Sequence, residues 1–216
     1  MTFPRLGTGT DSSDRLEEVF RVATKLIARD GFEKASMRAI AGEIGMSQAG
    51  LYHYFKSKDE LLYLIQKHTF TTLRNSLAAR LDPNSPPKER LRVMIHNHLE
   101  FFLAQMDALR VCAYELNKLG GEHYEEVQAI RQDYFRIAHS IVGEVLSEQN
   151  RSSVLSEKRT TLFVFGALNW IHMWYDTERP LEIKSISEEL FEMVLHGLTG
   201  KTFANGEQLQ YEISDQ

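Results

Sequence analysis

Apolar residues recur through most of the chain at intervals of three and four, the spacing that places them on one face of an α-helix. The first stripe follows Asp14 and Glu17, whose spacing predicts a capping box at the start of a helix that Gly31 ends. Five prolines and many Leu, Ala, Glu and Arg residues agree with a helical chain. We therefore expect an all-α fold, with later helices at about 87–104, 107–118, 122–148, 156–176 and 186–198.

A shorter pattern follows the first helix. Ser36 is expected to N-cap a helix over residues 37–44, and Gly45 to end it with a left-handed backbone. Ser47 is expected to cap the next helix, over residues 48–55. Two helices joined by a three- to four-residue turn that contains glycine form the helix-turn-helix pattern.

The second of these helices sorts its residues by face. Leu51 and Phe55 are a large apolar pair one turn apart, suited to contact with a neighbouring helix. The opposite face offers an amide, a methyl, a phenol and an imidazole, which can read base edges in a major groove. An ordinary helical hairpin with a polar outer face is the alternative, and geometry alone leaves both interpretations open. The residues of the outer face are Gln48, Ala49, Tyr52 and His53.

Groups near helix starts are suited to the phosphate backbone rather than to bases. Ser57 and Glu60 predict a second capping box, which starts a long helix to about Leu81 and places Lys58 in its first turn. Tyr54 lies at the edge of the apolar half of its helix, within reach of phosphate. The candidate DNA-binding residues are Ser36, Arg38, Ser47, Gln48, Ala49, Gly50, Tyr52, His53, Tyr54, Lys56 and Lys58.

The net charge of −5 is unevenly distributed. Residues 1–58 carry nine Lys and Arg against seven Asp and Glu, a net of +2, whereas residues 59–216 carry sixteen against twenty-three, a net of −7. Only the first part is suited to lie against nucleic acid. Because +2 is a modest charge, we expect usable DNA affinity to require two copies in one dimer.

Residues 31–62 resemble the signature of TetR-family transcriptional regulators, in which a short recognition helix ends in a Leu-Tyr-x-x-Phe motif. Here the motif is residues 51–55, preceded by Ile-Gly-Met-Ser at 44–47 and followed by Lys-Ser-Lys-Asp-Glu-Leu-Leu at 56–62. The resemblance implies an N-terminal three-helix DNA-binding domain with a helix-turn-helix. It also implies a C-terminal helical domain for ligand binding and dimerisation, and no cofactor.

The chain divides accordingly. We expect a flexible arm at 1–10, the helix-turn-helix domain at 11–58, the ligand-binding and dimerisation domain at 59–200 and a tail at 201–216. A proline-rich segment, 82–87, separates the long linking helix from the rest of the second domain because prolines cannot continue a helix.

The segment 162–175 is unusually apolar and almost without charge, so a helix there is expected to be buried on every side. In a monomer it would be the central core helix, and in a symmetric dimer it would also contact the partner copy. In TetR-family proteins the last two helices form a four-helix dimer interface, so the resemblance implies a homodimer on a palindromic operator. The predicted interface residues are Leu162, Phe163, Trp170, Leu190, Phe191, Val194, Leu195 and Leu198.

A local likeness indicates an effector class. Residues 166–170 and 174–175, with Arg131 and Tyr134, resemble TetR-type regulators that respond to acyl-CoA thioesters and control fatty-acid or steroid breakdown. The implied effector is a small apolar molecule that releases a repressor, first a long-chain acyl-CoA and second a drug-like compound. The candidate ligand-binding residues are Phe101, Met106, Tyr114, Arg131, Tyr134, Phe135, Phe165, Asn169, Trp170, Met173 and Trp174.

Simpler interpretations of these residues remain open. Aromatic and Met side chains commonly only fill a core, and Arg131 has Glu125, Glu126 and Asp133 nearby as partners on a solvated face. Asn169 is more informative, because an amide among apolar neighbours needs hydrogen-bond partners from a ligand, water or a second chain.

Other function classes fit poorly. No apolar run approaches the roughly 18–20 residues needed to span a bilayer, and the first residues lack the order of a secretory signal. A single cysteine, Cys112, precludes an intrachain disulfide and fits the cytoplasm. His96 and His98 diverge on a helix, and no metal-binding or nucleophile motif is evident, so we predict no enzyme and no metal site. The alternative of a different class is a helical enzyme or adaptor with a helix-turn-helix-like hairpin.

Overall fold

The computed structural model describes residues 10–148, 155–176, 178–179 and 181–199, and this part of the chain is helical without strands, as predicted. The rest of the predicted arm, most of the polar loop after Glu148 and the tail lie outside the described residues. The elements are α1 Thr10–Asp30, α2 Met37–Glu43, α3 Gln48–Tyr54, α4 Lys58–Arg80, α5 Pro87–Leu103, α6 Met106–Tyr114, the 3₁₀ helix η1 Leu116–Lys118, α7 Gly121–Glu148, α8 Glu157–Trp170, the 3₁₀ helix η2 Ile171–Met173 and α9 Ile183–Thr199.

Several predicted helix boundaries are wrong. Helix α6 ends at Tyr114 instead of continuing to 118, and α9 begins at Ile183 instead of 186. Helix α1 begins at Thr10, so Asp14 lies inside it and does not cap its start. Helix α8 ends at Trp170 instead of continuing to 176, and the chain tightens into η2. The imidazole Nδ1 of His172 lies 2.6 Å from the carbonyl oxygen of Asn169 and takes the acceptor that another α-helical turn would use.

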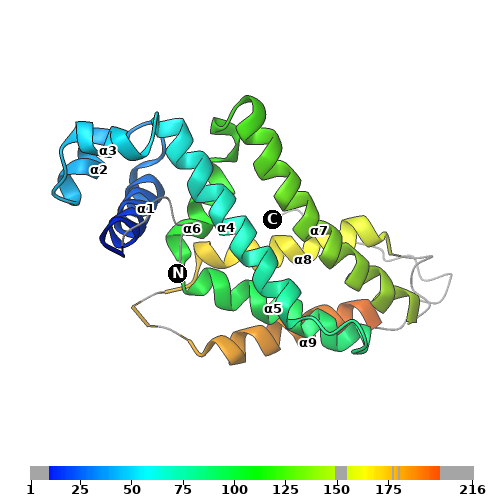
Figure 1. The fold of residues 1–216 in the computed structure, drawn as a ribbon. Helices are drawn as coiled ribbons and strands as arrows, with labels where there is room; N and C mark the ends of the chain where they lie inside the picture. Colours follow the sequence, from blue (N-terminus) through cyan, green and yellow to red (C-terminus); the bar gives the residue numbers. More distant parts are fainter. Residues whose placement is uncertain (1–9, 149–154, 177, 180, 200–216) are drawn as a thin grey trace, which may run out of the picture.

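Helices α1 to α3 form a small unit at one end of the molecule, here called the head (Figure 1). Leu51 and Phe55 are buried, as predicted for residues that contact a neighbouring helix, and the Phe55 ring meets Phe20 of α1 edge-on with centroids 5.6 Å apart. Each such buried aromatic or aliphatic side chain stabilises the folded state by about 1.5–3 kcal/mol. The inner face of the helix-turn-helix is therefore held against α1, and its outer face is left free.

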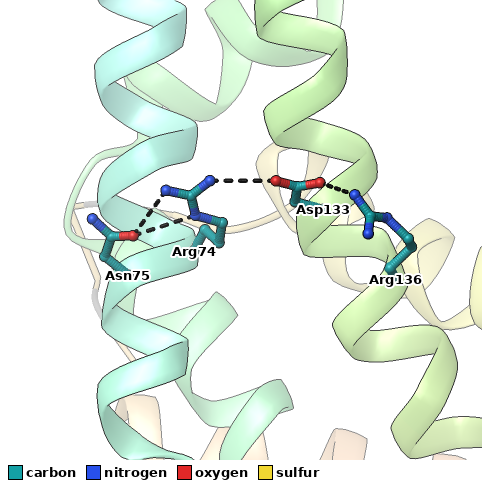
Figure 2. A network of polar contacts seen from close by, with 4 residues as sticks. All are labelled: Arg74, Asn75, Asp133 and Arg136. Atoms are coloured by element: carbon teal, nitrogen blue, oxygen red, sulfur yellow. Dashed lines mark hydrogen bonds and ion pairs between the residues drawn. The ribbon is translucent and has the colours of Figure 1, made fainter.

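Helices α4 to α9 form the body. Helix α4 leaves the head and runs beside α7, while α9 packs against α5 (Figure 1). Figure 2 shows Arg74 on α4 reaching across to Asp133 on α7, with Nη1 and Oδ2 3.5 Å apart, while Asp133 also pairs with Arg136 on its own helix. These side chains are about a third exposed or more, so the α4–α7 contact depends mainly on the apolar core beneath them. No helix of the described part is long and apolar enough to cross a membrane.

The head also contacts the body away from α4, through the turn that follows α1. The backbone N–H of Phe32 donates to Oε1 of Glu115 at 3.0 Å, and Nζ of Lys118 donates to Oε1 of Glu33 at 2.7 Å. Helix α1 packs against α6 beside these bonds. The head is thus joined to the body by the covalent link into α4 and by this second contact at η1.

Candidate functional site

The two short helices are built by the predicted caps. The hydroxyl of Ser36 accepts from the N–H of Ala39 at 3.1 Å, and that of Ser47 accepts from the N–H of Gly50 at 3.0 Å. Between them Gly45 has a φ of 65°, the left-handed conformation that glycine adopts without strain. Each cap satisfies a backbone N–H that has no partner within its helix.

The outer face of α3 is formed by Gln48, Ala49, Tyr52 and His53, all of which are exposed, with Tyr52 45% exposed. They lie on one side of a helix whose other side carries the buried Leu51. An amide, a methyl and a phenol in a row match the groups with which proteins read bases in a major groove.

The other candidate DNA-binding residues divide into three groups. Arg38 on α2 and Lys56 just after α3 are exposed, so both cations are free to meet phosphate. Tyr54 and Gly50 are half-buried, and a Cβ at Gly50 would come within 3.3 Å of the capping Ser47 hydroxyl. The Lys58 ammonium faces inward.

Lys58 joins α4 to the turn that follows α1. Its Nζ donates to the carbonyl oxygen of Phe32 at 2.8 Å and to that of Glu33 at 3.3 Å, and it lies 4.3 Å from the centroid of the Phe32 ring. Carbonyl oxygens and an aromatic face are all favourable partners for a cation. In this structure the half-buried Lys58 directs its charge toward the head. A contact between Lys58 and a DNA phosphate stays a prediction.

In a single chain α8 buries one side and exposes the other, so it is not the central core helix expected for a monomer. Thr161, Val164 and Leu168 face the core. Phe163 is 76% exposed and Trp170 59% exposed, and apolar or small residues continue along the same side of α8 and η2. The members of this exposed surface, here called the outer apolar face, are Leu162, Phe163, Gly166, Ala167, Trp170, Met173 and Trp174.

On α9, two predicted interface residues are not on the surface. Phe191 is fully buried and its ring lies 3.9 Å from the Arg92 guanidinium of α5, and Leu198 is buried as well. They belong to the core of one chain, because α9 directs this stripe toward α5. Leu190, Val194 and Leu195 are half-buried, and Met193, which the sequence analysis missed, is 73% exposed.

The predicted ligand-binding residues lie in two different places, on the surface and inside the body. Tyr114, Trp170, Met173 and Trp174 are exposed, and the Tyr114 hydroxyl lies 2.6 Å from Nε2 of His172 in η2, at the C-terminal end of the segment that carries the exposed apolar residues of α8. Inside the body, Tyr134, Phe135, Phe165 and Asn169 gather around His98. Met106 is buried in the core and Phe101 is half-buried beside Phe102, with ring centroids 5.2 Å apart.

The group around His98 is an aromatic cluster between α5, α7 and α8. The His98 ring centroid lies 5.9 Å from that of Tyr134 and 5.8 Å from that of Phe165, and Phe135 stacks on Phe165 at 5.9 Å. The Tyr134 hydroxyl lies 3.2 Å from Nδ1 of His98. Burial raises the pKa of the Tyr134 phenol, which stays protonated. This cluster is the candidate effector site, and His98 is the member that the sequence analysis set aside.

Arg131 does not lie on a solvated face paired with acids. Its guanidinium donates to the carbonyl oxygen of Cys112 at 3.0 Å and lies 4.7 Å from the Phe70 ring centroid. Burial lowers the pKa of Arg131, with the nearby Cys112 and Tyr124 acting in the opposite direction. Burial likewise raises the pKa of the Cys112 thiol to about 12, as expected for an inert cysteine.

Gln66 on α4 is a second functional candidate that the sequence analysis missed. Its side chain is fully buried, and neither amide atom has a hydrogen-bond partner among the described residues. The sequence indicates the burial of Gln66 through its position, four residues after Leu62 and four before Phe70 on an otherwise apolar stripe. A polar group on a buried stripe marks a place where another partner is needed.

Comparisons with known proteins agree with this architecture. The family model described as "Bacterial regulatory proteins, tetR family" matches residues 19–63, and the model "Tetracyclin repressor-like, C-terminal domain" matches residues 84–198, more than half of the chain. The fatty acid metabolism regulator protein of Bacillus subtilis (strain 168) is 20% identical over 185 residues, which are 85% of this chain and 95% of that protein.

Two solved structures share the fold. The ketosteroid transcriptional regulator KstR2 of Mycobacterium tuberculosis has a TM-score of 0.78 at 17% identity, covering 91% of this chain and 98% of that one. AibR, solved in complex with isovaleryl coenzyme A and operator DNA, has a TM-score of 0.71 at 22% identity, covering 83% of this chain and 97% of that one. The chain belongs to the TetR family of bacterial transcriptional regulators, with a DNA-binding helix-turn-helix head and a helical C-terminal domain.

Proposed function

We propose that this regulator is a homodimeric repressor, released from a palindromic operator when a small apolar effector enters the body. The observation that carries the proposal is the exposed outer face of α3, where Gln48, Ala49 and Tyr52 project from a helix capped by Ser47 and buried through Leu51. A helix with this division of faces can lie in a major groove while its inner side keeps the head folded.

The outer apolar face supports the dimer. Phe163 and Trp170 expose large rings on one side of α8, and Met193 exposes an apolar thioether chain on α9. A Cβ at Gly166 or Gly197 would meet nothing within 4 Å in a single chain, so helices of a second copy can approach closely there. A twofold dimer presents two copies of α3, which offsets the modest charge of one head.

The cluster around His98 supports an apolar effector. Rings of Phe135, Phe165 and Tyr134 line it, and aromatic walls with a few polar groups are typical of small-molecule sites. A long-chain acyl-CoA is the first candidate, because the similar B. subtilis protein is a fatty acid metabolism regulator and AibR binds a coenzyme A thioester, isovaleryl coenzyme A. A drug-like apolar compound is the second candidate.

Effector binding must reach the head for release to occur. The body offers two routes, α4 itself and the contact of Glu115 and Lys118 with the turn after α1. The effector has to bind the state that does not fit the operator more tightly, because equal affinity for both states shifts no equilibrium.

Fluorescence anisotropy tests the proposal with duplex DNA from upstream of the protein's own gene, titrated with acyl-CoA thioesters of increasing chain length. We expect tight binding that weakens with salt, with a slope set by the number of phosphate contacts, and release by one range of chain lengths. If the protein binds this DNA tightly and no thioester affects the binding, the assignment as a repressor stands and acyl-CoA is rejected as its effector. Absence of salt-sensitive binding to this DNA and to genomic DNA would favour the helical enzyme or adaptor.

A further inference from the structure

The imidazole of His98 has a ring nitrogen without a hydrogen-bond partner deep in the body. The residue is 2% exposed, and its Nε2 is buried with no partner among the described residues. Buried polar atoms are nearly always hydrogen-bonded, since an unpaired one has lost its bonds to water and gained none. A partner from outside the described chain is therefore expected at Nε2.

The neighbours of the ring determine which nitrogen carries the hydrogen. Oδ1 of Asn97 accepts from the Ser76 hydroxyl at 2.7 Å, which leaves the Asn97 NH₂ group to donate. That group donates to the carbonyl oxygen of Leu73 at 3.5 Å. The Tyr134 phenol is buried and protonated, so its O–H needs an acceptor, and giving the hydrogen to Nδ1 of His98, 3.2 Å away, satisfies it. A neutral imidazole in this arrangement carries its hydrogen on Nε2, so the unpaired atom is an N–H donor.

The donor is uncharged at neutral pH. Burial lowers the pKa of His98 to about 4, and the nearby Asn169 side chain acts in the opposite direction. Although Asn169 is close to the ring, it makes no hydrogen bond of normal geometry with Nε2. An uncharged donor in an apolar surrounding suits a neutral acceptor, because a carboxylate or phosphate would have to give up its hydration there.

The residues of the aromatic cluster differ in burial. His98 and Tyr134 are buried, whereas Phe135 and Phe165 on the α7 and α8 sides are half-buried. The His98 ring also contacts Phe102, with centroids 4.9 Å apart. An apolar molecule that enters between α7 and α8 would meet aromatic rings first and the N–H donor last.

We propose that Nε2–H of His98 donates a hydrogen bond to a carbonyl oxygen of the effector, and that the body thereby selects apolar molecules with a carbonyl over those without one. The inference rests on the proposed function, because it assigns the polar contact of the same effector site. A thioester, an ester and a ketone all present the required acceptor.

The test uses two probes that differ only at the carbonyl, decanoyl-CoA and its thioether S-decyl-CoA, with affinities measured by calorimetry. The wild-type protein should bind the thioester about tenfold to a hundredfold more tightly, the usual worth of a hydrogen bond to a buried donor that is otherwise unpaired. His98→Phe keeps an aromatic ring without the donor and should bind both probes equally, with circular dichroism as the check that it folds.

His96→Phe is the matched control. His96 lies on the same helix, with Nδ1 2.9 Å from the Ser187 hydroxyl of α9, and it is outside the cluster. This variant should keep the preference for the thioester. If His98→Phe fails to fold, His98→Met takes its place, since a flexible apolar side chain fills irregular space.

The outcomes separate this proposal from the choice of acyl-CoA. If the wild-type protein binds neither CoA derivative, that effector is rejected, and the comparison is repeated with methyl decanoate and decyl methyl ether. Equal preference for the carbonyl compound in wild-type and His98→Phe protein overturns the role of His98. Absence of any preference in the wild-type protein, or binding of none of the four probes, overturns it too.

Discussion

The carboxylate of Glu115 in the body accepts a hydrogen bond from the backbone N–H of Phe32 in the head, with Oε1 and N 3.0 Å apart. The residues are 83 positions apart in the chain. Because Phe32 also contributes its carbonyl oxygen to Lys58, a single turn is held both by α4 and by the end of α6. The position of the head on the body thus depends on these polar bonds together with the packing of α1 against α6.

Glu115→Ala should loosen this junction. The N–H of Phe32 would lose its acceptor in a half-buried site, which costs about 1–2 kcal/mol of stability. We expect a lower urea midpoint and a weaker dependence of operator binding on effector. Glu125→Ala on the exposed side of α7 is the control, and equal effects of the two changes would contradict the role of the junction.

Gln48→Ala and Tyr52→Ala should weaken specific DNA binding while leaving the fold intact, because both side chains are exposed on α3. Loss of a good base contact costs about 1–3 kcal/mol of discrimination. Operator affinity measured against competitor DNA, with circular dichroism for the fold, checks this. Gln132→Ala on the exposed side of α7 is the control, and undiminished operator affinity in both head variants would reject α3 as the reading helix.

Phe163→Asp should separate the dimer without unfolding the chain, since this ring is 76% exposed in one protomer. A carboxylate in the centre of an apolar interface is costly because it loses hydration on association. Sedimentation should show a monomer that binds the operator weakly. Ala129→Asp, which adds the same charge at an exposed site on α7, should leave the dimer intact, whereas dimeric Phe163→Asp protein would place the interface elsewhere.

Stability should fall in mild acid because of His98. Its folded-state pKa of about 4 lies below the ordinary histidine pKa of 6.5, so the unfolded chain binds the proton first. The stabilisation is complete above about pH 6.5 and is lost progressively toward pH 4, up to about 3 kcal/mol. Urea unfolding at a series of pH values should give a shallower loss for His98→Phe than for His96→Phe. Parallel losses in the two variants would assign the acid sensitivity to other groups.

Cys112 should resist thiol reagents while the protein is folded. Burial raises the pKa of its thiol to about 12, so the reactive thiolate is scarce, and the sulfur is also shielded from reagents. Labelling with a chromogenic disulfide at pH 8 should be slow in buffer and rapid in denaturant. Rapid labelling of the folded protein would show that the α4–α6 region opens readily.

The sequence by itself determined the local features. The Ser36 and Ser47 caps, the left-handed Gly45 and the burial of Leu51 depend on residues within one or two helical turns. Such interactions are set by spacing along the chain, which is why the helix-turn-helix and its exposed face could be predicted. The all-α fold followed in the same way from the period of the apolar residues.

Only the tertiary structure decided which partner each side chain meets across helices. Lys58 turned inward to the carbonyls of Phe32 and Glu33, and Phe191 turned toward α5. His98, dismissed as a ligand for metal, became the centre of an aromatic cluster drawn from three helices. Helical periodicity specifies a face of each helix, but the residue opposite that face comes from distant parts of the chain, and its identity depends on how the helices cross.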